Sequence, residues 1–336
     1  MPRLTTLEAI SFPVVERPVF TTLDGPDGDE VLAVAHKKAL VNGQTRRVLG
    51  VVSQSYRVVT NQEALGWAHE CCAHLFPTTK PAEWYVDLTD APASGGHCTI
   101  DLMHASAALS FTDVRPGKRP EVFGPFIRVT NSYNGLKALA FDIGFHRKVC
   151  RNGLIAPDTI IRFSFAHQRR DLGLGIRFEV AHDRLKKLQS RLGTYFSTVS
   201  QCLVPRMQFE RLVRGVLLIR PHGSTQPGSK EAEDWSRVEG HLSGLCDQYA
   251  QELGENAYAV LNVMTDFASR PPESRHVQRD RHSLQRLAGR WLSDFNQMCC
   301  EPGFSLTEYL EKLDKGAERQ HSEKRGAPPF WGRDAG

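Results

Sequence analysis

The sequence lacks the long apolar runs that a membrane-spanning protein needs. A spanning helix requires about 20 consecutive apolar residues, and no segment of the 336 residues approaches that length. The stretch at the N-terminus, MPRLTTLEAISFPVVERP, also lacks the apolar core of a secretory signal. These absences predict a cytoplasmic protein with no membrane partner.

Cysteine is present, but not in a pattern that binds metal or forms a disulfide framework. There is no Cys-x-x-Cys, and two pairs are adjacent in sequence. We therefore expect reduced thiols, as in a cytosol. The eight residues are Cys71, Cys72, Cys98, Cys150, Cys202, Cys246, Cys299 and Cys300.

Sequence motifs for nucleotide binding and covalent catalysis are missing as well. The chain has no Gly-x-x-x-x-Gly-Lys-Ser/Thr phosphate loop, no Gly-x-Gly-x-x-Gly and no Gly-x-Ser-x-Gly. We expect no cofactor and no metal, and catalysis has no support in the sequence.

Strand patterns and turn signals fill the first half of the chain. Asn42-Gly43 and Asn134-Gly135 favour hairpin turns, because both central residues of a type I′ turn need positive φ. Thr60 and Glu63 form a capping box ahead of an apolar pattern with helical spacing, which predicts one helix that ends before Pro77. Consecutive hairpins predict an antiparallel sheet.

The second half of the chain has helical periodicity. The sequence predicts an α+β fold, with an irregular N-terminal arm over residues 1–30, an antiparallel sheet domain over 31–180, a helical region over 181–316 and a disordered tail over 317–336. Arg177–Val180 is predicted as the last strand. The expected helices are 183–199, 205–218, 230–252, 257–267, 283–299 and 305–315.

Positive charge is concentrated in residues 115–170. This segment carries eleven Lys and Arg against three acids, whereas the whole chain has a net charge of only +4. Seven aromatic residues are interleaved with the cations. Clustered cations attract polyanions, and exposed aromatic rings stack on unpaired bases. The alternative interpretation is a buried aromatic core with a solvated basic face.

The hairpin around Asn134-Gly135 carries the candidate contacts with nucleic acid. We expect Tyr133 to be an exposed stacking platform and the cations to neutralise phosphates. Arg147 and Arg151 could clamp one phosphate, or could instead form salt bridges with Asp142 or Glu63. The candidate residues are Arg128, Tyr133, Lys137, Arg147, Lys148 and Arg151.

Two other functions stay open. Asp87 and Asp101 lie on neighbouring predicted strands and, with Asp142, could bind a metal ion in a nuclease or related hydrolase. The acidic helix 230–252 could instead bind a host defence or replication protein. The chain could also form a homo-oligomer.

Four sequence blocks carry a resemblance to a known family. Val52–Glu63 has the pattern V-S-x-x-Y-x-V-V-x-N-x-E, Thr130–Gly135 has x-N-S-x-x-G, Arg147–Leu154 has R-x-V-C-x-N-G-L, and Leu261–Phe267 has N-x-x-T. In this order the blocks resemble the phage/plasmid-like family classed as domain of unknown function 932. The resemblance implies a mobile-element context and brings no catalytic residues. We therefore expect a non-enzymatic protein of a phage or plasmid that binds single-stranded DNA, as an accessory to recombination or replication.

Overall fold

The computed structural model describes residues 3–25, 28–111, 114, 120–147, 152–155, 162–165, 167, 174–223 and 226–315. The chain divides into two compact units. Unit 1 is Met1–Leu109, Phe123–His146 and Asp158–Gln189, and unit 2 is Ser110–Val122, Arg147–Pro157 and Ser190–Gly336. The sequence predicted a single junction near Ala181, whereas the chain passes between these units more than once.

Unit 1 contains a mainly antiparallel sheet. Neighbouring strands follow the order β1 (Arg3–Leu4), β5 (Trp84–Pro92), β6 (His97–His104), β8 (Glu121–Ser132) and β9 (Leu139–Arg147), and β11 (Arg162–Phe165) pairs with β9. The pairs β1–β5, β5–β6, β6–β8 and β9–β11 are antiparallel. β7 (Leu109–Phe111) pairs with β8, and a 3₁₀ helix, η1 (Pro81–Glu83), precedes β5. The α+β class and the antiparallel sheet are confirmed.

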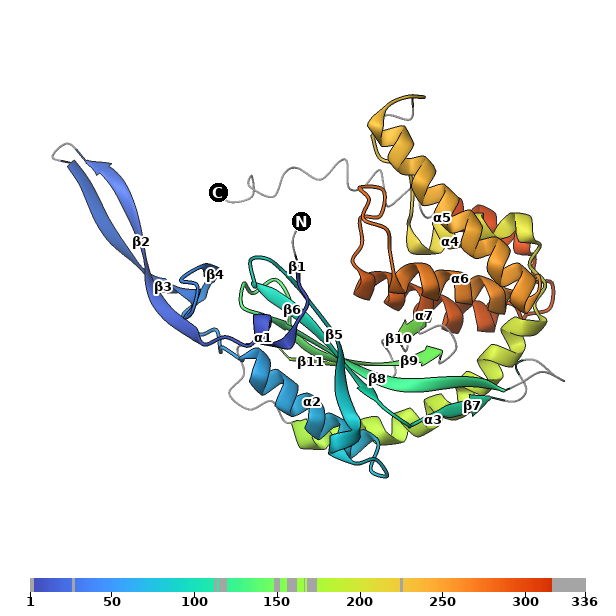
Figure 1. Cartoon of the computed structure of the whole chain (residues 1–336), viewed down its shortest axis with the longest axis horizontal. Helices are drawn as coiled ribbons and strands as arrows, with labels where there is room; N and C mark the ends of the chain where they lie inside the picture. The colour runs from blue at the N-terminus through green and yellow to red at the C-terminus, as the bar shows by residue number, and fades with distance from the viewer. Residues whose placement is uncertain are drawn as a thin grey trace. The chain divides into compact units, whose positions relative to one another are not determined.

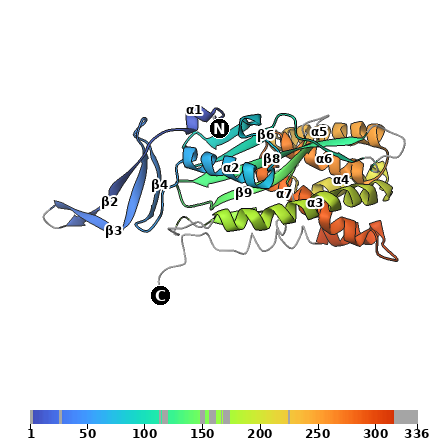
Figure 2. The same ribbon diagram turned by 90° about the horizontal axis from the view of Figure 1, so that it is seen from below.

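Helix α2 (Asn61–Leu75) packs against β6 (Figure 2). The predicted capping box is present: the Glu63 amide donates to the Thr60 hydroxyl at 3.1 Å, and the Thr60 amide donates to the Glu63 carboxylate at 2.7 Å. Its buried face consists of Ala64, Ala68, Cys71, Cys72 and Leu75, which share helical spacing. The sequence therefore predicted this helix correctly at both ends.

A second, three-stranded antiparallel sheet has the order β2 (Val14–Gly25), β3 (Gly28–Asn42) and β4 (Val48–Ser53). β2 and β3 continue beyond β4 as a two-stranded hairpin (Figure 1). We call its distal part, residues 18–24 and 29–37, the arm. The expectation of an irregular segment over residues 1–30 was wrong for the described residues, which form β1, α1 (Leu7–Ile10) and β2. The β-branched and aromatic run Val19–Leu23 favours a strand once β3 pairs with it.

The turn between β3 and β4 lies where Asn42-Gly43 predicts it, but its geometry differs. Positive φ occurs at Arg46, with a value of 61°, and not at Asn42 or Gly43. The Asn42 side chain accepts from the amides of Gln44 and Thr45 at 2.9 and 3.0 Å. The base of this sheet joins the rest of unit 1 through an apolar cluster of Phe12, Leu40, Leu49, Val52, Tyr56 and Tyr133.

Unit 2 is built around helix α6 (Ala257–Ser269), whose 13 residues are all buried. α4 (Arg206–Leu217), α5 (Lys230–Leu253), α7 (Arg281–Met298) and β10 (Asn152–Ile155) pack against it. Residues 306–315 are also helical. The five helices predicted from residue 205 onward are confirmed to within a few residues. None of the described helices is long and apolar enough to cross a membrane.

Helix α3 (Leu174–Gln201) begins earlier than predicted and includes Arg177–Val180, so the strand expected there was wrong. Four alternating residues fit a strand and a helix about equally well. A helix that already exists extends at low cost, because each further residue adds one hydrogen bond.

Candidate functional site

Arg128, expected to contact phosphate, is buried in unit 1. Its side chain is 1% exposed and makes two hydrogen bonds of 2.6 Å with the two carboxylate oxygens of Asp101. Asp101 lies directly opposite on β6. Such a two-pronged pair compensates for the loss of water around both charges. The prediction that Arg128 contacts phosphate was wrong, because its guanidinium faces a carboxylate inside the sheet.

Arg147, in unit 2, is also buried and paired with carboxylates. It is 1% exposed, and its guanidinium donates to both carboxylate oxygens of Glu121 at 2.6 and 3.0 Å and to Glu252 at 3.1 Å. The sequence offered Asp142 or Glu63 as its alternative partners, and neither of these is the partner described. A carboxylate pair this close leaves the side chain no freedom to reach a phosphate as placed.

Tyr133 is not an exposed stacking platform. It is 1% exposed, and its hydroxyl accepts from the amide of Asn61 at 2.8 Å. Asn61 is the first residue of α2, where backbone amides have no partner within the helix. Tyr133 thus satisfies the start of α2, and burial raises the pKa of its hydroxyl well above the usual value.

Two of the sequence blocks meet in one buried polar network around this tyrosine. The side-chain Nδ2 of Asn131 donates to the side-chain Oδ1 of Asn61 and to the backbone oxygen of Val59, both at 2.8 Å. The Tyr56 hydroxyl donates to the backbone oxygen of Ser132 at 2.6 Å. Hydrogen bonds between the two blocks, Val52–Glu63 and Thr130–Gly135, therefore hold α2, the sheet and the turn in register.

Lys137 occupies a different environment, while Lys148 and Arg151 lie outside the described residues. Lys137 follows the Asn134-Gly135 turn, in which Gly135 has a φ of 72° and Asn134 does not have positive φ. The connection between β8 and β9 therefore spans residues 133–138 and is not a two-residue turn. Lys137 is half-buried and lines a cleft of about 350 Å³.

We call this space the turn cleft. It lies entirely within unit 1 and is formed by the end of β4, the turn after β8, and His167. Its lining residues are Val51, Val52, Ser53, Tyr56, Asn134, Gly135, Leu136, Lys137, Ala138 and His167.

His167 gives the turn cleft a defined hydrogen-bonding chemistry. Its ring stacks on Tyr56 with a centroid distance of 4.6 Å and an interplanar angle of 13°. Nδ1 lies 3.1 Å from the backbone oxygen of Arg57, and a carbonyl can only accept, so Nδ1 must carry the proton. Burial lowers the pKa of His167 below its usual 6.5. The neutral ring then has Nε2 as an acceptor, and this buried atom has no hydrogen-bond partner in the described structure.

The sequence did not single out His167. It lies in a basic stretch without a recognisable motif, and only its packing on Tyr56 gives it a place in the cleft. The tyrosine of the V-S-x-x-Y block was the one signal that could have indicated this position.

The aspartates proposed as metal ligands are separated by other roles. Both oxygens of Asp101 accept from Arg128. Asp87 is an exposed residue of β5, at the point where the pairing of β5 with β6 is irregular. Asp142 is buried on β9. No three metal-ligating side chains gather anywhere in the part of the chain that the structure describes.

The acidic helix α5 is largely neutralised within unit 2. Its acids form ion pairs as follows: Glu231 with Arg275, Asp234 with Arg237, Glu239 with Arg214, Asp247 with Arg206, and Glu252 with Arg147. The acidic surface proposed for a protein partner is therefore engaged with arginines of the same chain.

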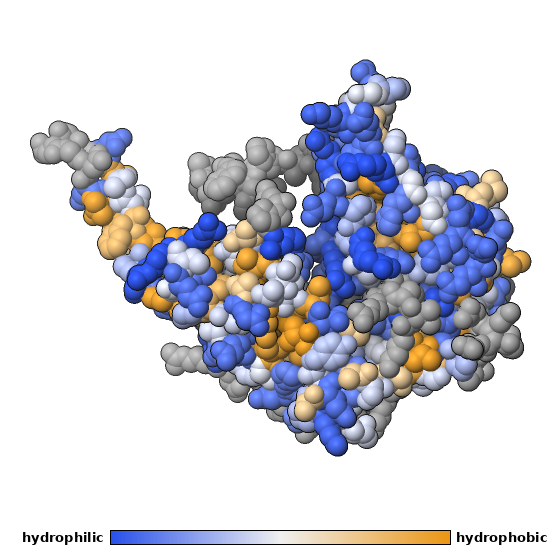
Figure 3. Space-filling view, in the orientation of Figure 1, coloured by the Kyte–Doolittle hydropathy of each residue, from blue (hydrophilic) through white to orange (hydrophobic). Residues whose placement is uncertain are grey.

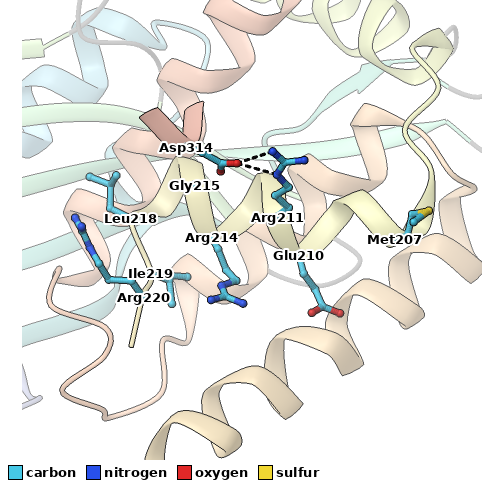
Figure 4. Close-up of a pocket in the computed structure, with 9 residues that line it drawn as sticks. All are labelled: Met207, Glu210, Arg211, Arg214, Gly215, Leu218, Ile219, Arg220 and Asp314. Carbon is cyan, nitrogen blue, oxygen red and sulfur yellow. Dashed lines mark hydrogen bonds and ion pairs between the residues drawn. The ribbon is translucent and has the colours of Figure 1, made fainter. Parts of the chain in front are cut away.

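A larger cleft of about 640 Å³ lies along α4 in unit 2 (Figure 4). Arg211 pairs with Asp314 at 2.5 Å. Arg214 pairs with Glu239 at 3.2 Å and lies 4.7 Å from the ring centroid of Trp235. Because carboxylates hold both of these arginines, the cleft offers a balanced surface and not a strong anion site.

Comparison with known proteins adds one finding. No curated protein and no solved structure matches the chain. The model of a family described as a domain of unknown function, DUF932, matches residues 104–291 of the 336. This match includes the turn cleft residues from Asn134 to His167 and the core of unit 2, but not the Val52–Glu63 block. The chain therefore belongs to the DUF932 family.

Proposed function

We propose that this protein binds single-stranded nucleic acid in the turn cleft. The observation that supports this most directly is the combination found there: the Lys137 ammonium, the unpartnered acceptor Nε2 of His167, and the stacked ring pair of Tyr56 and His167. An ammonium group attracts a phosphate, and a neutral ring acceptor takes a hydrogen bond from an amino group or a hydroxyl. A nucleotide carries a phosphate, amino or hydroxyl groups and a planar base, one for each of these three features.

The size of the turn cleft favours an unpaired strand over a duplex. A cleft of about 350 Å³ is at the lower end of the range in which small ligands bind, so it can take one nucleotide unit and not a base pair. Proteins reach bases of single strands because these can be turned out of the stack without breaking a pair.

The charge around the cleft also supports a polyanion. Of the eleven cations in residues 115–170, Arg128 and Arg147 are used in internal ion pairs. Lys137 lines the cleft, and the side chains of the other eight lie outside the described part. A cation that lines a cleft, such as Lys137, raises the local concentration of polyanions there and speeds their binding.

The biological setting completes the proposal. The sequence blocks resemble a phage/plasmid-like family, which suggests a protein of a mobile element that assists recombination or replication. Single strands are exposed during both processes. This part of the proposal comes from the resemblance, while the binding chemistry comes from the cleft.

The test is fluorescence anisotropy with a labelled single-stranded oligonucleotide, over a salt series and with a duplex competitor. Lys137→Ala should weaken binding about tenfold, since a hydrogen bond to a charged group contributes about 1.5 kcal/mol. It should also reduce the slope of log K against log salt by about 0.7, the value for one phosphate of a single strand.

Lys80→Ala is the matched control, because Lys80 is an exposed lysine of the same unit that does not line the cleft. It removes the same charge and should leave affinity nearly unchanged. No binding by the wild type at low salt would reject the proposed function. Equal losses for the two variants would show that the turn cleft is not the binding surface.

A further inference from the structure

The arm exposes large hydrophobic side chains to solvent. Phe20 is 57% exposed, Leu23 is 52% exposed and Val31 is 63% exposed. These residues lie on both strands of the hairpin, and hydrophobic surface is visible along it in Figure 3. A two-stranded hairpin without further packing is only marginally stable in water. The composition of the arm therefore indicates a surface that is covered by something else.

The arm also presents a strand edge that no strand of the described chain covers. β4 pairs with β3 only over Lys37–Val41, and the amide of Gln54 takes the backbone oxygen of His36. Over Asp29–Ala35 the described structure places no strand on that side of β3. Proteins block such edges with lysine, proline, a bulge or a covering segment. Val31–Ala33 contains neither lysine nor proline and lies before the irregular pairing of β3 with β2 that follows Ala33.

The outer edge of β2 differs from the edge of β3. It carries Arg17 and Pro18, and proline lacks the amide that a neighbouring strand needs. The edge of β3 is therefore the better template for a further strand.

Charge on the arm identifies what pairs with this edge. The tip is acidic, with Asp24 and Glu30, while the base carries Arg17, His36 and Lys37. An acidic tip repels nucleic acid. When two such arms lie antiparallel, the tip of each lies beside the base of the other, so opposite charges meet at both ends of an apolar centre.

We propose that two copies of this chain associate by antiparallel pairing of their β3 edges. Asp29–Ala35 has Leu32 at its centre, so a two-fold axis there places Val31 opposite the partner's Ala33. Glu30 then lies opposite the partner's Val34 and diagonal to the partner's His36 on the same face of the sheet. The two hairpins form one four-stranded sheet in which the exposed Val31 gains cross-strand neighbours. This association is independent of the proposed nucleic-acid binding.

The test compares the full-length chain with two charge variants by sedimentation velocity over a concentration series, without nucleic acid. The wild type should sediment as twice the chain mass of 37.6 kDa. Ala33→Lys and Ala33→Glu each place like charges close together across the two-fold axis, and each should weaken association about tenfold or more. An equimolar mixture of the two variants should restore the dimer, because opposite charges then face each other.

Restoration in the mixture also shows that both variants are folded. Ala73→Lys and Ala73→Glu, at an exposed position of α2, are matched controls and should dimerise like the wild type. A monomeric wild type would overturn the proposal. So would an oligomer that Ala33→Lys does not weaken, or a mixture of the Ala33 variants that stays monomeric.

Discussion

The central strands β8 and β9 and the arm depart from the usual distribution of side chains in opposite directions. In the central strands a charged group such as Arg128 is 1% exposed, whereas in the arm Val31 is 63% exposed. Charged residues are ordinarily outside, and large apolar residues are ordinarily covered.

The difference teaches where to look for partners. The buried arginines already have carboxylate partners within the chain, so their charge says little about a ligand. The apolar side chains of the arm have no such cover among the described residues. The most basic part of the sequence is therefore partly structural, while an ordinary-looking hydrophobic run is the better indication of an interaction.

Breaking the Asp101–Arg128 pair is expected to have the largest effect on stability. Asp101→Leu would leave a buried guanidinium without its carboxylate and should lower the free energy of unfolding by about 3–5 kcal/mol. Urea denaturation followed by tryptophan fluorescence measures this, since Trp67 and Trp84 lie in unit 1.

Two further variants sharpen this comparison. The double change Asp101→Leu with Arg128→Met removes both charges and should recover most of the loss. Ala33→Lys, a new charge on the exposed arm, should change the stability of the monomer by less than about 0.5 kcal/mol. If Asp101→Leu were as mild as Ala33→Lys, the buried pair would not organise the sheet.

Removing the Tyr133 hydroxyl should have an intermediate effect. Tyr133→Phe keeps the ring but leaves the buried amide of Asn61 without its acceptor, which should cost about 1–3 kcal/mol. Tyr85→Phe is the control, because Tyr85 is 43% exposed. Equal stabilities of the two variants would contradict the role of Tyr133 at the start of α2.

A smaller effect than that of Tyr133→Phe concerns pH and His167. Because burial lowers its pKa in the folded protein, the unfolded chain takes up a proton near the usual pKa of 6.5 while the folded chain does not. Stability should therefore fall as the pH drops below 6.5, with a slope of at most about 1.4 kcal/mol per pH unit from this residue. Denaturation curves between neutral and mildly acidic pH measure the slope.

His167→Gln isolates this contribution, because glutamine does not titrate. The variant should show a shallower decline below pH 6.5 than the wild type. His69, whose pKa is also lowered by burial, remains in both proteins and cancels in the difference. Parallel curves would mean that His167 is not kept neutral by its surroundings.

Local chemistry in the sequence determined the elements that depend on neighbours along the chain. The Thr60–Glu63 capping box and the apolar spacing behind it sufficed for α2, and the periodicities of α4 to α7 sufficed for the core of unit 2. These signals act within one or two helical turns, where the chain itself sets the geometry. The Asn134-Gly135 signal gave the place of a turn but not its length.

Only the tertiary structure decided which charges and rings are available to a ligand. Arg128 finds its carboxylate 27 residues away in Asp101, and Tyr133 finds its amide 72 residues away in Asn61. A basic or aromatic residue on a strand looks the same in sequence whether its face is wet or covered. Burial follows from strand order and register, and these depend on pairing between distant segments.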